Sequence, residues 1–285
     1  MIKRDIQQLL KELNITPKKS KGQNFVIDPN FIKKILSLSD IYDEDIVLEI
    51  GPGLGGLTKE LIKRAKKVIT VEIESKFCSY LSTQFSKNEN LEIINDDILD
   101  INLPEYDKVI ANLPYNITGP ILEKIFFKEK PPQGILCIEE SLAKRIFNLQ
   151  NYKLRSRISI NVNSYMIPEK IIPISPQSFY PNPKISLALV KLLPKPTLDP
   201  FLTEEKTKNF YLKFIAGIMP YKNKNLVNSI ELFFNKNEKI KLNKNIILDS
   251  LEMVKINNEK TFKLSINDIL DICKELYKLI NDFNS

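Results

Sequence analysis

The chain of 285 residues has no histidine, only three cysteines and no long apolar run. The missing histidine effectively excludes a His-based catalytic triad and a zinc site. The cysteines Cys78, Cys137 and Cys273 have neither metal-ligand nor disulfide spacing, so we interpret them as core thiols of a reducing cytoplasm. No apolar window approaches the length of a membrane-spanning helix, about 18 residues. The N-terminus also lacks the apolar core of a signal peptide. We therefore expect a cytoplasmic protein with no metal ion and no membrane contact.

Positive charge is in excess, and part of it is concentrated near the start. The chain has 42 Lys and Arg residues against 35 Asp and Glu, a net charge of +7. Residues 1–34 hold eight basic and three acidic side chains. Such a cluster favours a polyanionic partner, because cationic side chains contact phosphates and release counterions. A lysine-rich, solvated surface with no partner is the alternative interpretation.

The middle of the chain alternates strand-like and helix-like segments. This order predicts an α/β fold with βαβ units and a mainly parallel sheet. The segments 157–167 and 185–193 are predicted as later, antiparallel strands. Strands are expected at 45–50, 67–73, 91–95, 108–112 and 134–140, and helices near 56–66, 75–87, 118–128 and 141–150.

A domain boundary is expected at 192–200, where three prolines in nine residues stop regular structure. The sequence beyond it has helical periodicity and no convincing strand. We therefore predict a large domain over 1–195, with its basic segment 1–34, and a small all-helical domain over 200–285. A monomer is the default expectation.

A glycine-rich turn follows the first predicted strand of the sheet. Gly51, Gly53 and Gly56 satisfy G-x-G-x-x-G, and Glu72 ends the next strand 21 residues after Gly51. The glycines let the backbone approach a ligand, and the acid accepts hydrogen bonds from ribose hydroxyl groups. A glycine-rich turn with no ligand would leave the same pattern.

Acidic residues also follow the third strand, in "INDDIL". Asp97 is placed to receive the exocyclic amine of an adenine ring, while Asp96 is interpreted as solvated. One adenosine-containing ligand across the carboxyl edge of the sheet is therefore predicted. This pattern alone leaves NAD and S-adenosylmethionine open.

The fourth strand ends in "NLPYNIT", residues 112–118. An isolated N-x-P-Y is a common connection from strand to turn. In this order of motifs, however, it resembles the loop of S-adenosylmethionine-dependent enzymes that methylate amines. "GQNFVID", "VLEIGPGLGGLT", "VEIE", "DDIL", "FYPNPKISLALV" and "PYKNKNLVNSI" accompany it. Together they are similar to the ribosomal RNA adenine dimethyltransferase family, over roughly residues 15–285.

The resemblance implies a Rossmann-like class I methyltransferase domain with S-adenosylmethionine as cofactor. An adenine amine is a poor nucleophile, because its lone pair is delocalised into the ring. Asn112 and the Leu113 carbonyl are expected to accept its N–H groups, with Pro114 bracing the backbone and Tyr115 stacking on the flipped base. Positioning then replaces the missing histidine.

Further site residues come from the resemblance alone. It implies that Asn24, Val26 and Asn112 contact the cofactor and that Phe179, whose default interpretation is core, forms a second aromatic wall. Glu49 is interpreted as a structural or methionine-side contact. Candidate RNA contacts are Lys18, Lys19, Lys21, Arg157, Lys222 and Lys224.

The expected substrate is a pair of adjacent adenosines in a 3′-terminal hairpin of small-subunit ribosomal RNA, within a pre-ribosomal particle. Dimethylation of both would belong to ribosome biogenesis. A large-subunit adenine methyltransferase is the enzymatic alternative. An assembly factor whose binding matters more than its catalysis is the other one, and a dehydrogenase would leave "NLPYNIT" unexplained.

Overall fold

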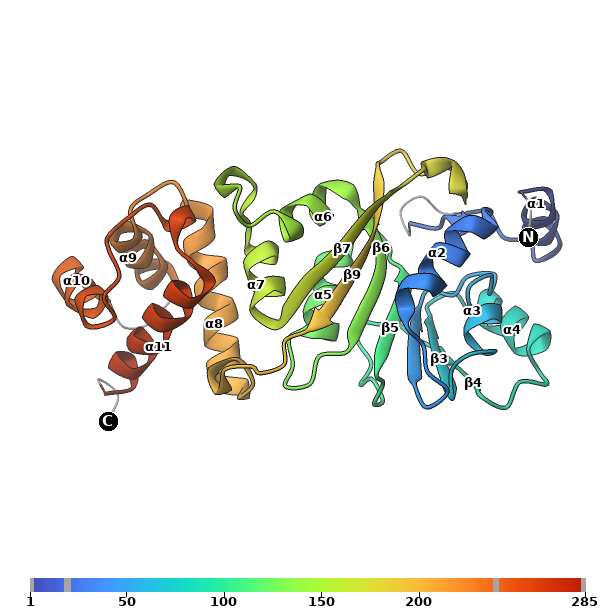
Figure 1. Cartoon of the computed structure of the whole chain (residues 1–285), viewed down its shortest axis with the longest axis horizontal. Coiled ribbons are helices and arrows are strands. Elements are labelled where there is room, and N and C mark those ends of the chain that lie inside the picture. The colour runs from blue at the N-terminus through green and yellow to red at the C-terminus, as the bar shows by residue number, and fades with distance from the viewer. Residues whose placement is uncertain (1–2, 18–21, 238–240, 283–285) are drawn as a thin grey trace. The chain divides into compact units, whose positions relative to one another are not determined.

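The computed structural model describes residues 3–17, 22–237 and 241–282 (Figure 1). The chain forms two compact units. The first consists of Met1–Phe126, Pro131–Lys144 and Ile167–Pro194, and the second of Phe127–Lys130, Arg145–Met166 and Lys195–Ser285.

A seven-stranded sheet organises the first unit, in the order β4-β3-β2-β5-β6-β9-β7. The strands β4, β3, β2, β5 and β6 pair in parallel, and β9 pairs antiparallel with β6. The predicted α/β class and parallel sheet are thereby confirmed. The bounds are β2 Ile46–Ile50, β3 Lys67–Glu72, β4 Leu91–Asn95, β5 Lys108–Asn112, β6 Gln133–Glu139, β7 Met166–Ile174 and β9 Leu187–Pro194.

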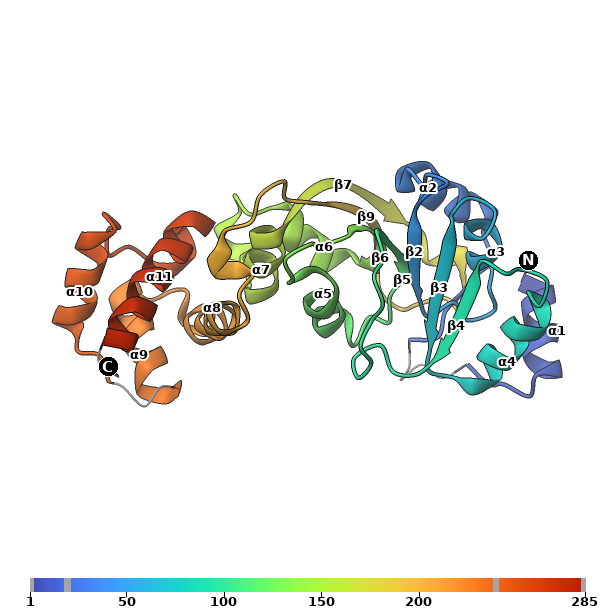
Figure 2. The same cartoon turned by 90° about the horizontal axis from the view of Figure 1, so that it is seen from below.

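The strand order reverses beside β2. From β2 the chain continues outward through β3 and β4, then returns to the other side of β2 with β5 and β6 (Figure 2). In parallel sheets, ligands bind outside the carboxyl ends of the strands at such a reversal. The helices of this unit that follow strands are α3 Thr58–Leu61, α4 Ser75–Gln84, α5 Thr118–Phe126 and α6 Glu140–Phe147, the last of which runs on into the second unit.

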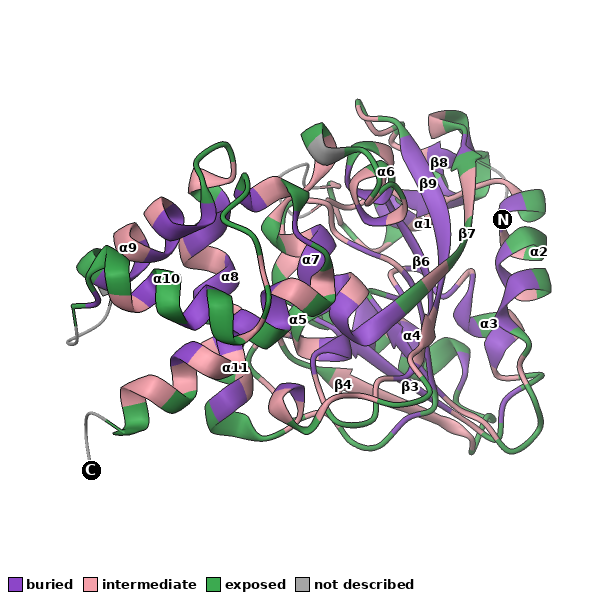
Figure 3. Cartoon of the chain, turned by 60° about the vertical axis from the view of Figure 1, so that its left-hand side comes forward, coloured by how far each residue is buried: buried purple, intermediate pink, exposed green. Residues whose placement is uncertain are grey.

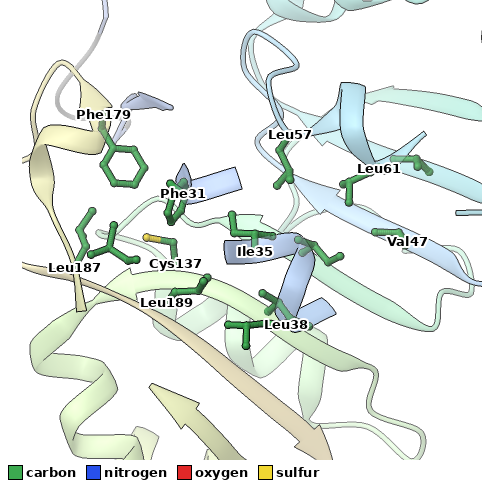
Figure 4. Packing of buried hydrophobic residues seen from close by; sticks show 14 of the residues in the cluster. Phe31, Ile35, Leu38, Val47, Leu57, Leu61, Cys137, Phe179, Leu187 and Leu189 are labelled. Atoms are coloured by element: carbon green, nitrogen blue, oxygen red, sulfur yellow. The ribbon is translucent and has the colours of Figure 1, made fainter. Parts of the chain in front are cut away.

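The sheet is packed against helix α2, Pro29–Ser39. Asp28 caps this helix by accepting a hydrogen bond from Asn30 N at 2.9 Å, and Pro29 fits its first turn. Phe31 and Ile35 on α2 join Val47 and other strand residues in one buried cluster (Figure 4). Strand β9 is buried along most of its length, whereas β7 is buried only at its two end residues, Met166 and Ile174 (Figure 3).

Two short strands fix the segment that precedes α2. β1, Phe25–Val26, pairs antiparallel with β8, Phe179–Tyr180. Ile27 N donates a further hydrogen bond to Ser178 O at 2.9 Å. The motifs "GQNFVID" and "FYPNP", about 150 residues apart in the sequence, therefore lie side by side.

The start of the chain forms a helix, which composition alone did not indicate. In α1, Lys3–Glu12, Ile6 and Leu10 are buried in a cluster with Phe25 and Phe77. Lys76 Nζ donates to the carbonyl of Asn14 at 2.9 Å and so holds the end of this segment against α4. The basic N-terminal segment thus uses its apolar side chains as part of the core.

The second unit is helical, and one prediction inside it is wrong. Residues 157–165 form helix α7 rather than a strand, because Ser156 and Ser159 make a reciprocal capping box. The helix is buried on several sides, so its apolar residues do not show a helical period. The helices are α7 Arg157–Tyr165, α8 Glu205–Ile218, α9 Leu226–Asn237, α10 Lys244–Met253 and α11 Ile266–Asp282.

The boundary also differs from the contiguous split at 195–200. The second unit does take up the chain at Lys195, but it includes residues 145–166 as well. The reason is side-chain packing: Ser164 Oγ and Tyr211 Oη share a hydrogen bond of 2.7 Å, and Tyr165 Oη donates to Leu202 O at 2.9 Å. Helix α7 therefore belongs with the helices that follow it.

Two smaller expectations concern cysteines and membranes. All three cysteines are free and buried, as predicted. Within the described ranges, no helix is long and apolar enough to span a bilayer.

Candidate active site

A cavity lies at the carboxyl edge of the sheet, where the strand order reverses. The residues that line it come from the ends of β2, β3, β4 and β5 and from the segment before α2. Most of the predicted cofactor and catalytic residues meet there: Asn24, Val26, Gly51, Gly53, Glu72, Asp97, Asn112 and Pro114.

The glycine turn is shaped by steric demands at two positions. Gly53 has φ +54°, and a Cβ there would lie 3.2 Å from the ring of Phe25. Gly55 has φ +72°, and its Cβ would collide with Leu81 and Phe85 at 2.7 Å. The close approach to helix α4 is therefore made by Gly55 and not by Gly56, which the motif pattern had selected.

Glu72 is buried at the end of β3, and both of its oxygen atoms accept hydrogen bonds. Oε2 accepts from Gly53 N at 3.2 Å, and Oε1 accepts from Glu74 N at 3.0 Å. Burial raises the pKa of Glu72, while these N–H groups act in the opposite direction. The carboxylate is thus fixed beside the turn before any ligand arrives.

Glu49 lines the same cavity from β2 and is only 2% exposed. Thr58 Oγ1 donates to its Oε2 at 2.6 Å. The pKa of Glu49 is raised to about 8, mainly because the group is buried; hydrogen bonding with Thr58 opposes this rise, and the nearby carboxylate of Glu72 adds to it. At neutral pH a protonated, uncharged carboxyl group therefore borders the cavity.

Asp96 and Asp97 follow β4, and both line the cavity. Asp97 Oδ1 accepts a hydrogen bond from Leu99 N at 2.9 Å, and Asp96 Oδ1 accepts from Asp97 N at 2.7 Å. Asp96 is exposed and Asp97 is half-buried. The sequence interpretation gave the cavity to Asp97 alone, whereas the structure brings both residues to it.

Asn112 ends β5 with one half of its amide engaged and the other half unused. Its Nδ2 donates to the carbonyl of Asn24 at 3.2 Å. Its Oδ1 is enclosed, and none of the described residues hydrogen-bonds to it. A buried acceptor without a partner costs free energy and calls for an explanation, which a ligand N–H group would supply.

The loop after Asn112 is held by the residues that follow it. Leu113 is buried and its N–H donates to Cys137 O at 3.1 Å, which continues the pairing of β5 with β6. The Pro114 carbonyl accepts from Ile117 N at 3.3 Å and from Thr118 Oγ1 at 3.0 Å. Thr118, the last residue of "NLPYNIT", therefore closes the turn onto the first residues of α5.

Two predicted aromatic walls lie behind the cavity lining. Tyr115 is half-buried and packs on the cluster shown in Figure 4, and its enclosed hydroxyl group is close enough to the Asn112 side chain for that amide to affect its pKa. Burial raises the pKa of Tyr115 well above its usual range. Phe179 is 0% exposed and packs edge-on against Phe31, with 5.0 Å between ring centroids. Phe31, not Phe179, borders the cavity.

Sequence reasoning missed several cavity residues. Ile6 from α1, Phe25, Phe77 and the half-exposed Ile73 all line it. The signal for α1 was present, because Ile6 and Leu10 are spaced for one face of a helix. The signal for the others was not, since single aromatic or aliphatic residues do not indicate a cavity.

The candidate RNA contacts differ in their surroundings. Arg157 and Lys224 are exposed, in the second unit. Lys222 is half-buried, and its Nζ donates to the carbonyls of Lys153 at 3.0 Å and Arg155 at 2.7 Å. Lys222 thus has a structural role in closing a loop. Lys18, Lys19 and Lys21 lie outside the described residues.

The fold and the cavity together define the class of protein. It is a class I S-adenosylmethionine-dependent methyltransferase. Four features define this class: a parallel sheet whose strand order reverses, a glycine turn, a fixed acid at the end of the second sheet strand, and a loop with an amide side chain after the fourth. Two features fit this cofactor and an amine substrate: the Asn112 oxygen that no described residue hydrogen-bonds, and the Gly53 backbone, which lies in the cavity lining with no side chain beside the Phe25 ring.

Comparison with known proteins gives the family. The ribosomal RNA adenine dimethylase family matches residues 14–269, a stretch that begins just after α1. The chain belongs to this family. A probable ribosomal RNA small subunit methyltransferase A of Methanococcoides burtonii is 36% identical over 73% of this chain and 75% of its own length. A ribosomal RNA small subunit methyltransferase A of Caldanaerobacter subterraneus is 32% identical over 93% and 99%.

Solved structures agree. A dimethyladenosine transferase from Plasmodium falciparum has a TM-score of 0.73 and 27% identity, covering 89% of this chain and 98% of that one. The 23S rRNA methyltransferase ErmE has a TM-score of 0.63 and 21% identity, covering 89% and 99%, and shares the fold. S-adenosylmethionine is the methyl donor of this fold and family.

Proposed function

We propose that the chain dimethylates N6 of two adjacent adenosines in a 3′-terminal hairpin of small-subunit ribosomal RNA, as a step of ribosome biogenesis. The observation that carries the amine-directed chemistry of this proposal is the enclosed Oδ1 of Asn112, to which no described residue donates a hydrogen bond. The small-subunit target is supported by the names of the two relatives described above, each at least 32% identical to this chain. We further propose that the chain acts in the cytoplasm as a monomer, on a pre-ribosomal particle.

The proposed catalysis needs acceptors rather than a strong base. Oδ1 of Asn112 and the carbonyl of Leu113 accept the two N–H groups of the adenine amine, which draws the lone pair out of conjugation. Pro114 has no N–H to compete for these acceptors, and Tyr115 gives its ring to the flipped base. S-adenosylmethionine, when bound, supplies the electrophilic methyl group. The amine proton leaves to water afterwards.

The residues proposed to hold the cofactor form the rest of the cavity. Glu72 accepts the ribose hydroxyl groups, and its two backbone hydrogen bonds keep it oriented for that contact. Asp97 accepts the adenine amine of the cofactor, while Val26 and Ile73 supply apolar contact. The Gly51 and Gly53 backbone lies against the ligand without side-chain obstruction.

Contact with RNA is proposed for the exposed cations. Arg157 and Lys224 carry charge on the surface of the second unit, and cations attract phosphates without reading sequence. Lys222 holds its own loop and is therefore a weaker candidate than its neighbour Lys224. Lys18, Lys19 and Lys21 keep the role that the basic cluster and the resemblance suggest.

One labelling experiment tests the reaction and its target. Purified protein is incubated with tritiated S-adenosylmethionine and either small or large ribosomal subunits that lack adenine methylation. We expect label in the small-subunit RNA, recovered as dimethyladenosine, and none in fully methylated control subunits. Label in large-subunit RNA alone would favour the large-subunit alternative. Tight binding to small subunits without label in any RNA would replace the enzyme by an assembly factor.

A further inference from the structure

Asn112 is held by a contact from outside its own loop. Its Nδ2 donates to the backbone carbonyl of Asn24 at 3.2 Å, although Asn24 lies 88 residues earlier in the chain. The NH₂ group and the oxygen of an amide branch from the same carbon and face different neighbours, so a partner for the NH₂ group determines where the oxygen lies. The Asn24 carbonyl therefore leaves Oδ1, the enclosed and unpartnered atom, as the remaining acceptor.

The side chain of Asn24 shapes the turn that carries this carbonyl. Asn24 Nδ2 donates to Gly22 O at 3.0 Å, a local hydrogen bond across the turn 22–24. Gly22 has φ +62°, a conformation that other residues rarely adopt. A Cβ on Gly22 would lie 3.2 Å from Pro114 Cα, so the turn is packed directly on the proposed catalytic loop.

We propose that Asn24 is a positioning residue, whose side chain holds the turn 22–24 so that its carbonyl orients the Asn112 amide for the target amine. This inference rests on the proposed function, in which Asn112 accepts the amine. It differs from the role that the resemblance implies, a direct contact of Asn24 with the cofactor. A positioning residue affects the rate of methyl transfer, whereas a cofactor ligand affects cofactor affinity.

Two variants of Asn24 separate these roles. Asn24→Ala removes the donor to Gly22, and Asn24→Ser keeps a donor hydroxyl on a side chain that is one atom shorter. Methyl transfer is measured in a single turnover on undermethylated small subunits, and affinity by calorimetry with S-adenosylhomocysteine. We expect Asn24→Ala to slow transfer about ten-fold and to change the affinity by less than about two-fold, with Asn24→Ser recovering most of the rate. Asn30→Ala, at an exposed asparagine of α2, is the matched control.

A double-mutant cycle with Asn112→Ala shows whether Asn24 acts through Asn112. Once the Asn112 amide is absent there is nothing to orient, so adding Asn24→Ala should cause no further loss. The inference would be overturned if the rate loss of the double variant equalled the product of the two single losses. It would also be overturned if Asn24→Ala reduced cofactor affinity as much as it reduced the transfer rate. If Asn112→Ala alone kept the wild-type rate, the proposed catalytic role of Asn112 would fail first. A slow Asn112→Ala with a fully active Asn24→Ala would refute only the positioning role.

Discussion

Glu72 and Asn112 end two strands on either side of β2, yet their oxygen atoms differ in hydrogen bonding. Both oxygens of Glu72 accept backbone N–H groups, one from Gly53 and one from Glu74. The Asn112 oxygen accepts nothing from the described residues. An acceptor that is already satisfied keeps its position when a ligand binds, whereas an unsatisfied one gains a partner at that moment. This difference matches the proposed roles, in which Glu72 binds the cofactor and Asn112 binds the amine that reacts.

The largest expected effect comes from the unsatisfied acceptor. Asn112→Ala should reduce the rate of methyl transfer by about 10³-fold, because an oriented acceptor for the developing charge is lost. Cofactor affinity should stay within a few-fold of wild type. Single-turnover rates on undermethylated small subunits, together with S-adenosylhomocysteine binding, measure both quantities.

Asn161→Ala provides a matched control for this change. Asn161 on α7 is also buried, and none of the residues that the structure describes hydrogen-bonds to its Oδ1, but it does not line the cavity. Its substitution should alter thermal stability and leave the transfer rate unchanged. Equal rate losses in the two variants would mean that Asn112→Ala slows transfer by destabilising the fold. The unsatisfied Asn112 oxygen would then have no special role in the reaction.

An intermediate effect is expected from the satisfied acceptor. Glu72→Gln keeps the size of the side chain but turns an NH₂ group toward Gly53 N or Glu74 N, so two donors meet. Cofactor affinity should fall by about 10- to 100-fold, the effect of one buried unmade hydrogen bond. The transfer rate at saturating cofactor should change much less. Titration calorimetry and single-turnover rates measure the two quantities.

Glu74→Gln is the control for Glu72, because Glu74 is close in sequence and does not line the cavity. It should bind cofactor with nearly wild-type affinity. Glu72→Gln could instead slow methyl transfer at saturating cofactor and leave cofactor affinity unchanged. Glu72 would then act in the reaction, and its assignment as a cofactor-binding residue would be wrong.

The sequence predicted the sheet well because its strands are short apolar runs between turn signals. The bounds of β4 and β5 agree with the prediction, and the βαβ order left little choice of topology. The segment 157–167 was misread because α7 is buried on several sides and shows no clear helical period. There the serine pair that caps the helix was the better signal, and it outweighs an alternating pattern.

The sequence predicted those site residues that belong to a motif with a known chemical role. It did not predict the residues whose positions depend on tertiary packing. Glu72 and Asn112 follow from the order of motifs along the strands. The burial of Phe179 behind Phe31 does not, because it depends on how β8 pairs with β1. The contribution of Ile6 was hidden for a similar reason, since α1 reaches the cavity only through tertiary packing.

The smallest expected effect concerns Glu49, which is a buried acid of the cavity like Glu72. Its Oε2 accepts a hydrogen bond from Thr58 Oγ1, and burial is the main cause that raises its pKa to about 8. Because this pKa is higher than in the unfolded chain, the folded state holds the proton more tightly, and its stabilising contribution is lost as pH rises through 8. Between pH 7 and pH 9 the free energy of unfolding should fall by about 1 kcal/mol in wild type relative to Glu49→Gln.

Urea unfolding at several pH values, without cofactor, measures this difference. Glu60→Gln is a suitable control, because the ion pairs of Glu60 with Lys63 and Arg64 lower its pKa and so keep its titration far below pH 7. The control should therefore parallel wild type between pH 7 and pH 9. If Glu49→Gln did the same, Glu49 would be ionised in the folded protein at neutral pH. Glu49 would then add a buried anion to the cavity, and it would belong with Glu72 among the residues that hold a cationic cofactor.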